Sequence, residues 1–381
     1  MGALLTCLGA VLGGTASAQA RVVHPTDEYL SSIRATSVIS KDIAAAKGSS
    51  ADAMAARLRR ARRIDSIGTL DGPLETVFGT IADVAVAPSG AIYILDIANQ
   101  LVRGFSPTGV PVIQLGRLGS GPPDLRTPLS IWTEGDSTVV VADGVLGIKY
   151  FSAKPRSSTP TRVLRLGAPP IAACATGDHV VSVGTSGEPI GGSVKVGVEP
   201  LGSVTARSGE LVRRFGESYP SENAMVRRSM SESVVACTPE GTIVTSLSKL
   251  PFVTGYRADG SPSWVARLKD FVVGRHVEEA NSRGQRSIGI DDRDPRNSFV
   301  RRITPVGGSM VVVQVGLMTP ESIRDRSIWS RIDSYVVDVR DGQGAFVSST
   351  LPLLAAMRGE RLVAFENDPY PRVVLIQVPR N

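Results

Sequence analysis

Short apolar runs, separated by turns that contain glycine or proline, fill the chain from about residue 64 onward. The first clear unit has four such runs, at 83–87, 91–96, 101–105 and 110–115. The next unit repeats this order, with runs at 129–132, 138–143, 147–151 and 162–167. A repeat of about 40 to 50 residues with four short strands is typical of propeller blades, because one meander cannot bury both of its faces without neighbours.

A glycine-rich connector, residues 116–128, joins these two units and reads G-R-L-G-S-G-P-P-D-L-R-T-P. It resembles the inter-blade connector of NHL-repeat-like six-bladed β-propellers, which follows the pattern G-x-x-G-x-G-P-x-x-(F/L)-x-x-P. Segment 90–105 is similar to the core of the same repeat. The resemblance covers about residues 64–167, and it implies a fold rather than a particular activity.

Weaker copies of the unit continue to the C-terminus. Blades three and four are predicted to begin at 172–183 and 234–245, and a fifth blade is predicted from the runs at 310–315, 334–339 and 345–348. The last blade has only the runs 361–365 and 372–378, so we predict that a strand near 63–68 completes it and leaves no open sheet edge. The polar stretch 269–300 is interpreted as an insertion between blades. The predicted fold is therefore an all-β, six-bladed propeller of four-stranded antiparallel blades, closed by an N-terminal strand.

The N-terminus has the pattern of a secretory signal. An apolar run from Leu4 to Gly14 is followed by small residues that end at Ala20, which predicts cleavage after Ala20. Lipid attachment at Cys7 is not expected, because Thr6 precedes it where a very small residue is needed. We therefore divide the chain into a signal peptide (1–20), an N-terminal extension (21–63) and the propeller (64–381), and we expect an exported protein, periplasmic or secreted.

The extension contains a predicted helix over residues 51–63, capped by Ser49 or Ser50. Met54, Leu58 and Ala61 share one face of this helix, and arginines cover most of the remainder. The pattern favours a solvated helix that precedes the folded domain. A basic surface for anionic lipid or nucleic acid is the alternative interpretation.

Composition limits the remaining possibilities. The 381 residues are 42% hydrophobic and carry a net charge of +6, which allows a large core and gives little reason to expect nucleic acid as a partner. Apart from the N-terminal segment, no stretch reaches the roughly 18 consecutive apolar residues that span a bilayer. Three cysteines and three histidines make a structural zinc site or a disulfide-dense scaffold improbable.

Candidate chemical groups are few. The acidic cluster of Asp291, Asp292 and Asp294 lacks the pattern of a calcium loop and has arginines beside it. The glycines of the connector, Gly116, Gly119 and Gly121, have turn spacing rather than the spacing of a phosphate cradle. The histidines are scattered and are interpreted as surface or turn residues: His24, His179 and His276. Asp83 is the only acidic residue found near the start of an inner strand. We therefore predict no catalytic residue, metal ligand or cofactor site.

Two further pairs of residues are assigned to structure. Asp96 and Asp143 occupy the same place in the first two blades, where a carboxylate that follows a strand can accept hydrogen bonds from loop N–H groups. Cys174 and Cys237 end the first strands of blades three and four. Because equivalent positions on adjacent blades radiate from the axis, we predict two free, buried thiols rather than a disulfide.

Three classes of function fit these observations. The first is a non-enzymatic, monomeric binding or scaffold propeller of the cell envelope that holds a protein, peptide or glycan at its face. The second is a metal-dependent hydrolase or lyase similar to the gluconolactonase and paraoxonase type. The third is an arginine-rich binder of anionic polymer. The sequence favours the first class, because no set of axial ligands for a metal is found.

Overall fold

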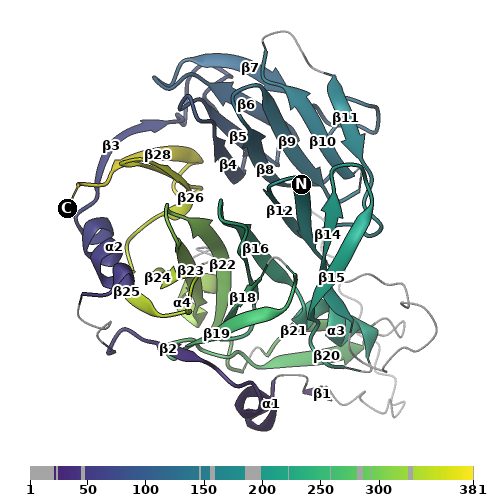
Figure 1. Ribbon diagram of the computed structural model, residues 1–381, viewed down its shortest axis with the longest axis vertical. Coiled ribbons are helices and arrows are strands. Elements are labelled where there is room, and N and C mark those ends of the chain that lie inside the picture. The colour runs from purple at the N-terminus through teal and green to yellow at the C-terminus, as the bar shows by residue number, and fades with distance from the viewer. Residues whose placement is uncertain are drawn as a thin grey trace, which may run out of the picture.

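Six β-sheets of four or five strands are arranged as blades around a central axis (Figure 1). This confirms the predicted all-β, six-bladed propeller. The computed structural model describes residues 21–22, 25–43, 48–145, 147–154, 159–184, 199–221, 223–257, 259–280, 286–291, 293–324 and 329–380.

Blades one to three are meanders in which each strand pairs antiparallel with the next. Blade one contains β4 (Ile81–Val86), β5 (Ile92–Asp96), β6 (Leu101–Phe105) and β7 (Pro111–Leu115). Blade two contains β8 (Pro128–Glu134), β9 (Thr138–Asp143), β10 (Gly147–Ser152) and β11 (Pro160–Leu164). Blade three contains β12 (Ala172–Thr176), β13 (His179–Val183), β14 (Pro200–Ala206) and β15 (Leu211–Glu217). The first strand of each blade lies nearest the axis.

Blades four and five each contain four consecutive strands, and blade four gains a fifth from the N-terminal region. Blade four contains β16 (Ser233–Cys237), β17 (Ile243–Leu247), β18 (Phe252–Tyr256) and β19 (Pro262–Leu268). Blade five contains β22 (Asn297–Pro305), β23 (Met310–Met318), β24 (Arg331–Asp338) and β25 (Gly344–Ser348). The run 310–315, predicted as the start of blade five, is instead its second strand. The true first strand, β22, carries Arg301 and Arg302, and these charges hid its strand pattern.

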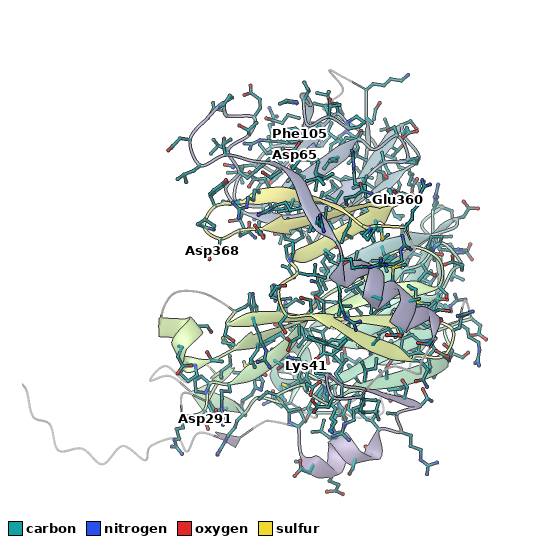
Figure 2. The ribbon with its side chains drawn as sticks, turned by 90° about the vertical axis from the view of Figure 1, so that its left-hand side faces the viewer. Lys41, Asp65, Phe105, Asp291, Glu360 and Asp368 are labelled. Atoms are coloured by element: carbon teal, nitrogen blue, oxygen red, sulfur yellow. A yellow bond between two sulfur atoms is a disulfide. The ribbon has the colours of Figure 1, made fainter. Side chains whose placement is uncertain are left out.

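Blade six is closed by a strand from the other end of the chain. It contains β26 (Leu353–Arg358), β27 (Arg361–Glu366), β28 (Arg372–Gln377) and β3 (Arg62–Ile67). β3 pairs antiparallel with β28, from Ile67 opposite Val373 to Arg62 opposite Gln377. The turn between β27 and β28, which carries Asp368, projects to the left in Figure 2. The predicted closure by an N-terminal strand is confirmed.

The segment that precedes β3 follows the outer rim of blades four to six (Figure 1). It contains β1 (Arg21–Val22), α1 (Asp27–Ser32), β2 (Ser37–Ile39) and α2 (Ser50–Arg59). β2 pairs in parallel with β19 as the fifth strand of blade four. α2 is capped by Ser49, but its apolar face is not solvated: Ala51, Ala55 and Leu58 are buried against blades five and six. The helix therefore fills a gap between two blades.

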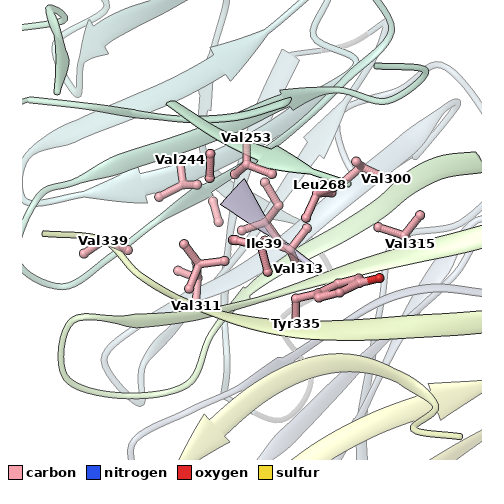
Figure 3. Packing of buried hydrophobic residues seen from close by; sticks show 14 of the residues in the cluster. Ile39, Val244, Val253, Leu268, Val300, Val311, Val313, Val315, Tyr335 and Val339 are labelled. Atoms are coloured by element: carbon pink, nitrogen blue, oxygen red, sulfur yellow. The ribbon is translucent and has the colours of Figure 1, made fainter. Parts of the chain in front are cut away.

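Ile39 shows how this segment contributes to the core. Its side chain is 1% exposed and lies among apolar residues of blades four and five (Figure 3). A side chain on Gly344 would place its Cβ 2.5 Å from Cδ1 of Ile39, so the absence of a side chain at residue 344 makes room for Ile39. The wedge between blades four and five is thus filled by a residue that lies almost 200 positions before it in sequence.

The stretch between blades four and five forms a hairpin outside the ring. β20 (His276–Ala280) and β21 (Arg286–Ile290) pair with each other, and β1 adds to β20. Asp291, just after this hairpin, lies in the lower part of the molecule in Figure 2. The remaining helices are α3 (Ala224–Met230) and α4 (Pro320–Arg324). Within the described residues, no helix has the length and apolar character needed to span a membrane.

Candidate functional site

The innermost strands are joined to one another by side chains at the axis. Asp83 of β4 accepts a hydrogen bond from the backbone N–H of Ile131 on β8 at 3.0 Å. The same carboxylate forms an ion pair with Arg302 of β22, which comes from blade five. The guanidinium of Arg302 also lies over the ring of Phe365 in blade six, 5.4 Å from its centroid. The carboxylate of Asp83, the only axial candidate found in the sequence, is therefore engaged by protein groups.

Further links continue around the ring. The Ser130 hydroxyl in blade two accepts a hydrogen bond from Ala173 N in blade three, at 3.2 Å. In blade five, Thr304 donates to Leu354 O in blade six at 2.8 Å. Among the described residues, no group of three or more histidine, cysteine or acidic side chains is placed to hold a metal ion. The described axial contacts thus join neighbouring blades and, through Asp83 and Arg302, also link blades one and five.

The inner strands of blades three and four are joined covalently. Cys174 on β12 and Cys237 on β16 form a disulfide with a Cα–Cα distance of 5.7 Å. The prediction of two free thiols was wrong, because the first strands of adjacent blades lie beside the axis, where the blades converge rather than spread apart. Outer strands diverge with distance from the axis, whereas inner strands pack within disulfide range.

Asp96 and Asp143 have the structural role that the sequence predicts. Asp96 is fully buried and accepts hydrogen bonds from the backbone N–H groups of Gly79, Thr80 and Asn99. Asp143 is also fully buried and accepts from three backbone N–H groups, those of Arg126, Thr127 and Val145. Each carboxylate joins the segment that enters its blade to the turn between the second and third strands of that blade.

The glycine-rich connector is a turn, as predicted, and its polar groups are occupied internally. Asp124 accepts from Arg117 Nε at 2.8 Å and from Gly121 N at 2.6 Å. These hydrogen bonds hold the pKa of Asp124 below its usual value. The Lys149 ammonium donates to the carbonyls of Gly121, Pro122 and Asp124. The connector thus binds a lysine of its own blade.

The remaining candidate residues do not come together. Asp291 pairs with Arg275 at 2.9 Å and Asp294 with Arg296 at 2.8 Å, while Asp292 and His24 lie outside the described residues. His179 is the first residue of β13 and is partly buried. His276 is 2% exposed, with Nδ1 3.2 Å from Gly274 O and Nε2 3.3 Å from the amide nitrogen of Asn297. Its assignment as a surface or turn residue was wrong, because it lies on the buried side of the β20 hairpin.

A spacious cleft lies between the outer strands of blades three and four. It has a volume of about 750 Å³ and is bounded by β15, by the outer half of blade four and by α1. Phe215 and Tyr256 meet edge to face inside it, with ring centroids 5.3 Å apart. At the α1 side, Tyr29 and Tyr219 make a similar contact at 5.1 Å. The sequence did not indicate this cleft, because its walls come from strands about 40 residues apart and from a helix almost 200 residues earlier.

The cleft has aromatic walls and charged rims. Arg214 and Glu217 on β15 both line it and both are exposed. Burial raises the pKa of Tyr29 to about 12, so its hydroxyl stays protonated at neutral pH. Burial likewise raises the pKa of Tyr256. The cleft therefore offers apolar rings, hydroxyl groups and one charge of each sign.

No protein-family model matches the chain, and no curated protein matches its sequence. Solved structures do match. A candidate exported protein from Bacteroides fragilis NCTC 9343 aligns over 90% of this chain and 100% of its own, with a TM-score of 0.54 and 10% identity. A member of the DUF4221 family from Bacteroides vulgatus ATCC 8482 covers 84% and 98% of the two chains, with a TM-score of 0.55 and 9% identity. Virginiamycin B lyase from Staphylococcus aureus reaches a TM-score of only 0.41 at 10% identity, over 84% of this chain and 99% of its own. The first two similarities support the propeller fold alone.

Proposed function

We propose that this protein is a non-enzymatic binding propeller that takes an extended peptide segment of a partner protein into the cleft between blades three and four. The proposal rests on how the chain fills the wedge between the next two blades, four and five. Between blades four and five, the chain's own β2 lies along the edge of β19 and inserts Ile39 into the core. The cleft between blades three and four lies beside the edge strand β15, and its volume of about 750 Å³ leaves room for an equivalent segment.

The edge strand beside the cleft suits this mode of binding. In the described residues, β15 pairs only with β14, so its outer backbone groups are available to an added strand. Leu211 and Val212 on this strand are 48% and 45% exposed, which is unusual for large apolar side chains on an edge. Main-chain hydrogen bonds supply affinity in strand addition, and side-chain pockets supply specificity.

The cleft also indicates the composition of the peptide. Its rings would receive an apolar or aromatic side chain, as blade five receives Ile39. Arg214 and Glu217 favour flanking residues of opposite charge at each end. We therefore expect a short extended segment with a central apolar residue and one acidic and one basic neighbour.

An extracytoplasmic location fits the same proposal. Disulfides persist in oxidising compartments, and Cys174 and Cys237 are joined by one. The predicted signal over residues 1–20 lies outside the described residues and stays a prediction. A relationship to NHL repeats also stays a prediction, carried by the connector at 116–128.

The alternative functions have less support. A lactonase-like or lyase-like mechanism needs an axial metal, and the one axial carboxylate that the sequence offered, Asp83, is paired with Arg302. A polymer-binding basic helix needs free arginines. In α2, Arg57 donates to Pro379 O and Arg59 donates to Val347 O and Phe346 O, so both guanidinium groups bind the propeller.

A peptide display library selected against the folded, full-length chain tests the proposed function. Selected peptides should share a central apolar residue and bind with a stoichiometry of one per monomer. The substitution Arg214→Glu should then reverse the charge preference of the selected peptides. Arg60→Glu, on the exposed side of α2, is the matched control and should leave the selection unchanged.

Two outcomes would overturn the proposal. The first is a selection that yields no enriched sequence. The second is enrichment that is the same for the wild type and for Arg214→Glu, which would place the peptides elsewhere on the molecule. A stoichiometry of two would indicate that the peptide also displaces β2 from blade four.

A further inference from the structure

A second cleft lies between blades two and three, at the end of the ring where the first and second strands of each blade are joined. It has a volume of about 650 Å³. Trp132 and Glu134 of β8 line one wall, and Arg207, which follows β14, lines the other. The disulfide between Cys174 and Cys237 forms part of the same lining. The cleft is separate from the proposed peptide site, which lies between blades three and four.

The wall formed by blade two is a row of side chains on one face of the sheet. Trp132 on β8 is in register with Val140 on β9, and Val140 is in register with Tyr150 on β10. Residues in register share a face, and Glu134 lies two positions beyond Trp132 on the same side. Val140 and Tyr150 pack against Ala173 of blade three, so this face points into the interface between the two blades.

Buried polar atoms without partners gather at this place. Among the described residues, four atoms without a hydrogen-bond partner come from this one cluster: Trp132 Nε1, Glu134 Oε1, Tyr150 Oη and Arg207 Nε, of which Arg207 Nε has only a long ion-pair contact of 4.0 Å to Asp178. Tyr150 is only 4% exposed. Native proteins rarely leave buried polar groups unpaired, and such groups call for an explanation such as a bound ligand or water. Trp132, Glu134 and Arg207 line the cleft, and Tyr150 lies on the same face of blade two as Trp132, so their concentration points to a ligand.

The ion pair across the cleft explains why these polar atoms do not form hydrogen bonds with one another. Arg207 is held by Glu134 Oε2 at 3.1 Å and donates to Gly177 O at 3.0 Å. Arg207 Nε also lies 4.0 Å from Asp178 Oδ1, beyond hydrogen-bond range, so Nε and Glu134 Oε1 are left without a hydrogen bond. The side chain of Arg207 is 36% exposed, so this residue can swing aside and open the interface to a ligand.

The chemistry of the four atoms defines the class of ligand. Trp132 Nε1 and Arg207 Nε only donate, Glu134 Oε1 only accepts, and the Tyr150 hydroxyl does both. Arg207 pairs with Glu134 and also lies 4.0 Å from Asp178, so an anionic ligand would meet repulsion from two carboxylates and a cationic ligand would meet repulsion from the guanidinium. A hydroxyl group both donates and accepts, and adjacent hydroxyls satisfy such a mixed set. We propose that this cleft binds an uncharged, hydroxyl-rich ligand of one or two sugar units.

The emission of Trp132 allows a direct test. The purified chain is titrated with glucose, N-acetylglucosamine and their dimers, and both tryptophan emission and calorimetric heat are recorded. At least one sugar should bind and shift the emission. The shift should disappear in Trp132→Phe, because the two other tryptophans lie in other blades. Glucuronic acid, which has the shape of glucose and a negative charge, should bind roughly tenfold more weakly.

Tyr150→Phe distinguishes a ligand group from a structural one. Removing a hydroxyl that has no partner should leave the melting temperature unchanged or slightly higher, while sugar affinity falls roughly tenfold. Tyr335→Phe is the matched control in the third strand of blade five. It should leave sugar binding unchanged, and because the Tyr335 hydroxyl donates to Asp270 Oδ2 at 3.5 Å, it should lower the melting temperature.

Three results would overturn the proposal. One is the absence of any emission change or heat at about 10 mM sugar, a concentration above the dissociation constant expected for such a small ligand. Another is sugar binding that persists unchanged in both Trp132→Phe and Tyr150→Phe. The third is a clear loss of melting temperature in Tyr150→Phe, which would mean that a structural water satisfies this hydroxyl. None of these results depends on the peptide selection, so the two proposals fail independently.

Discussion

Arg302, on the innermost strand of blade five, forms an ion pair with Asp83, on the innermost strand of blade one. Blade six lies between these two blades, so the contact bridges the axis instead of joining neighbours. The side chains of Asp83 and Arg302 are 11% and 19% exposed. The pair occupies the place where an axial metal site was considered, and it ties the last blades of the ring to the first.

Breaking this pair should destabilise the protein. Asp83→Ala should lower the free energy of unfolding by about 3 kcal/mol, because it leaves the Arg302 guanidinium buried without its carboxylate. The double variant Asp83→Leu, Arg302→Met should lose less, since no unpaired charge remains. Urea denaturation measures both. Asp65→Ala, at an exposed position on β3, serves as the control. Equal losses in the single and double variants would show that charge pairing is unimportant here.

The disulfide should also contribute to stability. Replacing both Cys174 and Cys237 with serine should lower the free energy of unfolding by about 2–4 kcal/mol, because the bridge closes a long loop in the unfolded chain. Titration of unreduced, denatured protein that lacks residues 1–20 should detect no free thiol. A result of two thiols per chain would contradict the bridge.

Ile39 should contribute far more to the stability of the fold than its neighbour Val38. Ile39→Ala should cost about 2–5 kcal/mol of unfolding free energy, because it empties the wedge between blades four and five. Val38→Ala, at a residue that is 47% exposed, should change stability by less than about 0.5 kcal/mol. Thermal denaturation of the two variants gives the comparison. Similar melting of both would mean that β2 is not anchored in the core.

Substitution of Asp96 or Asp143 should destabilise the protein. Asp96→Ala or Asp143→Ala leaves three backbone N–H groups without their acceptor, so we expect a loss of about 3 kcal/mol in each case. Peptide and sugar binding should persist in whatever fraction of the protein remains folded. A variant that keeps its melting temperature but loses binding would assign that aspartate to a site.

The raised pKa of Tyr29 predicts a change in stability at alkaline pH. Its pKa is near 12 in the folded protein and 10.0 in the absence of burial. The stability from its buried, protonated hydroxyl is complete below pH 10 and is lost as pH rises toward 12, because only the unfolded state ionises in this window. Tyr29→Phe should therefore show a smaller fall in stability between pH 10 and 12. Absorbance titration at alkaline pH should likewise lose one late-titrating tyrosine.

The sequence alone determined the type of blade, the number of blades and the manner of closure. These features depend on local patterns: the alternation of apolar runs and turns, the place of Asp96 and Asp143 after their strands, and the shortage of strands after residue 353. Each pattern lies within one blade or at the end of the chain. Packing between distant segments does not alter such patterns.

Tertiary structure decided what happens between the blades. No local pattern predicts that Asp83 pairs with Arg302, that Cys174 forms a disulfide with Cys237, or that Ile39 packs next to Gly344 between two blades. Each of these contacts depends on how inner strands converge and outer strands diverge around a closed ring. The divergence of outer strands opens the proposed peptide cleft, whereas the second cleft lies where inner strands of neighbouring blades meet. A binding site formed between blades becomes visible only when the ring has closed, because its walls belong to strands that are far apart in sequence.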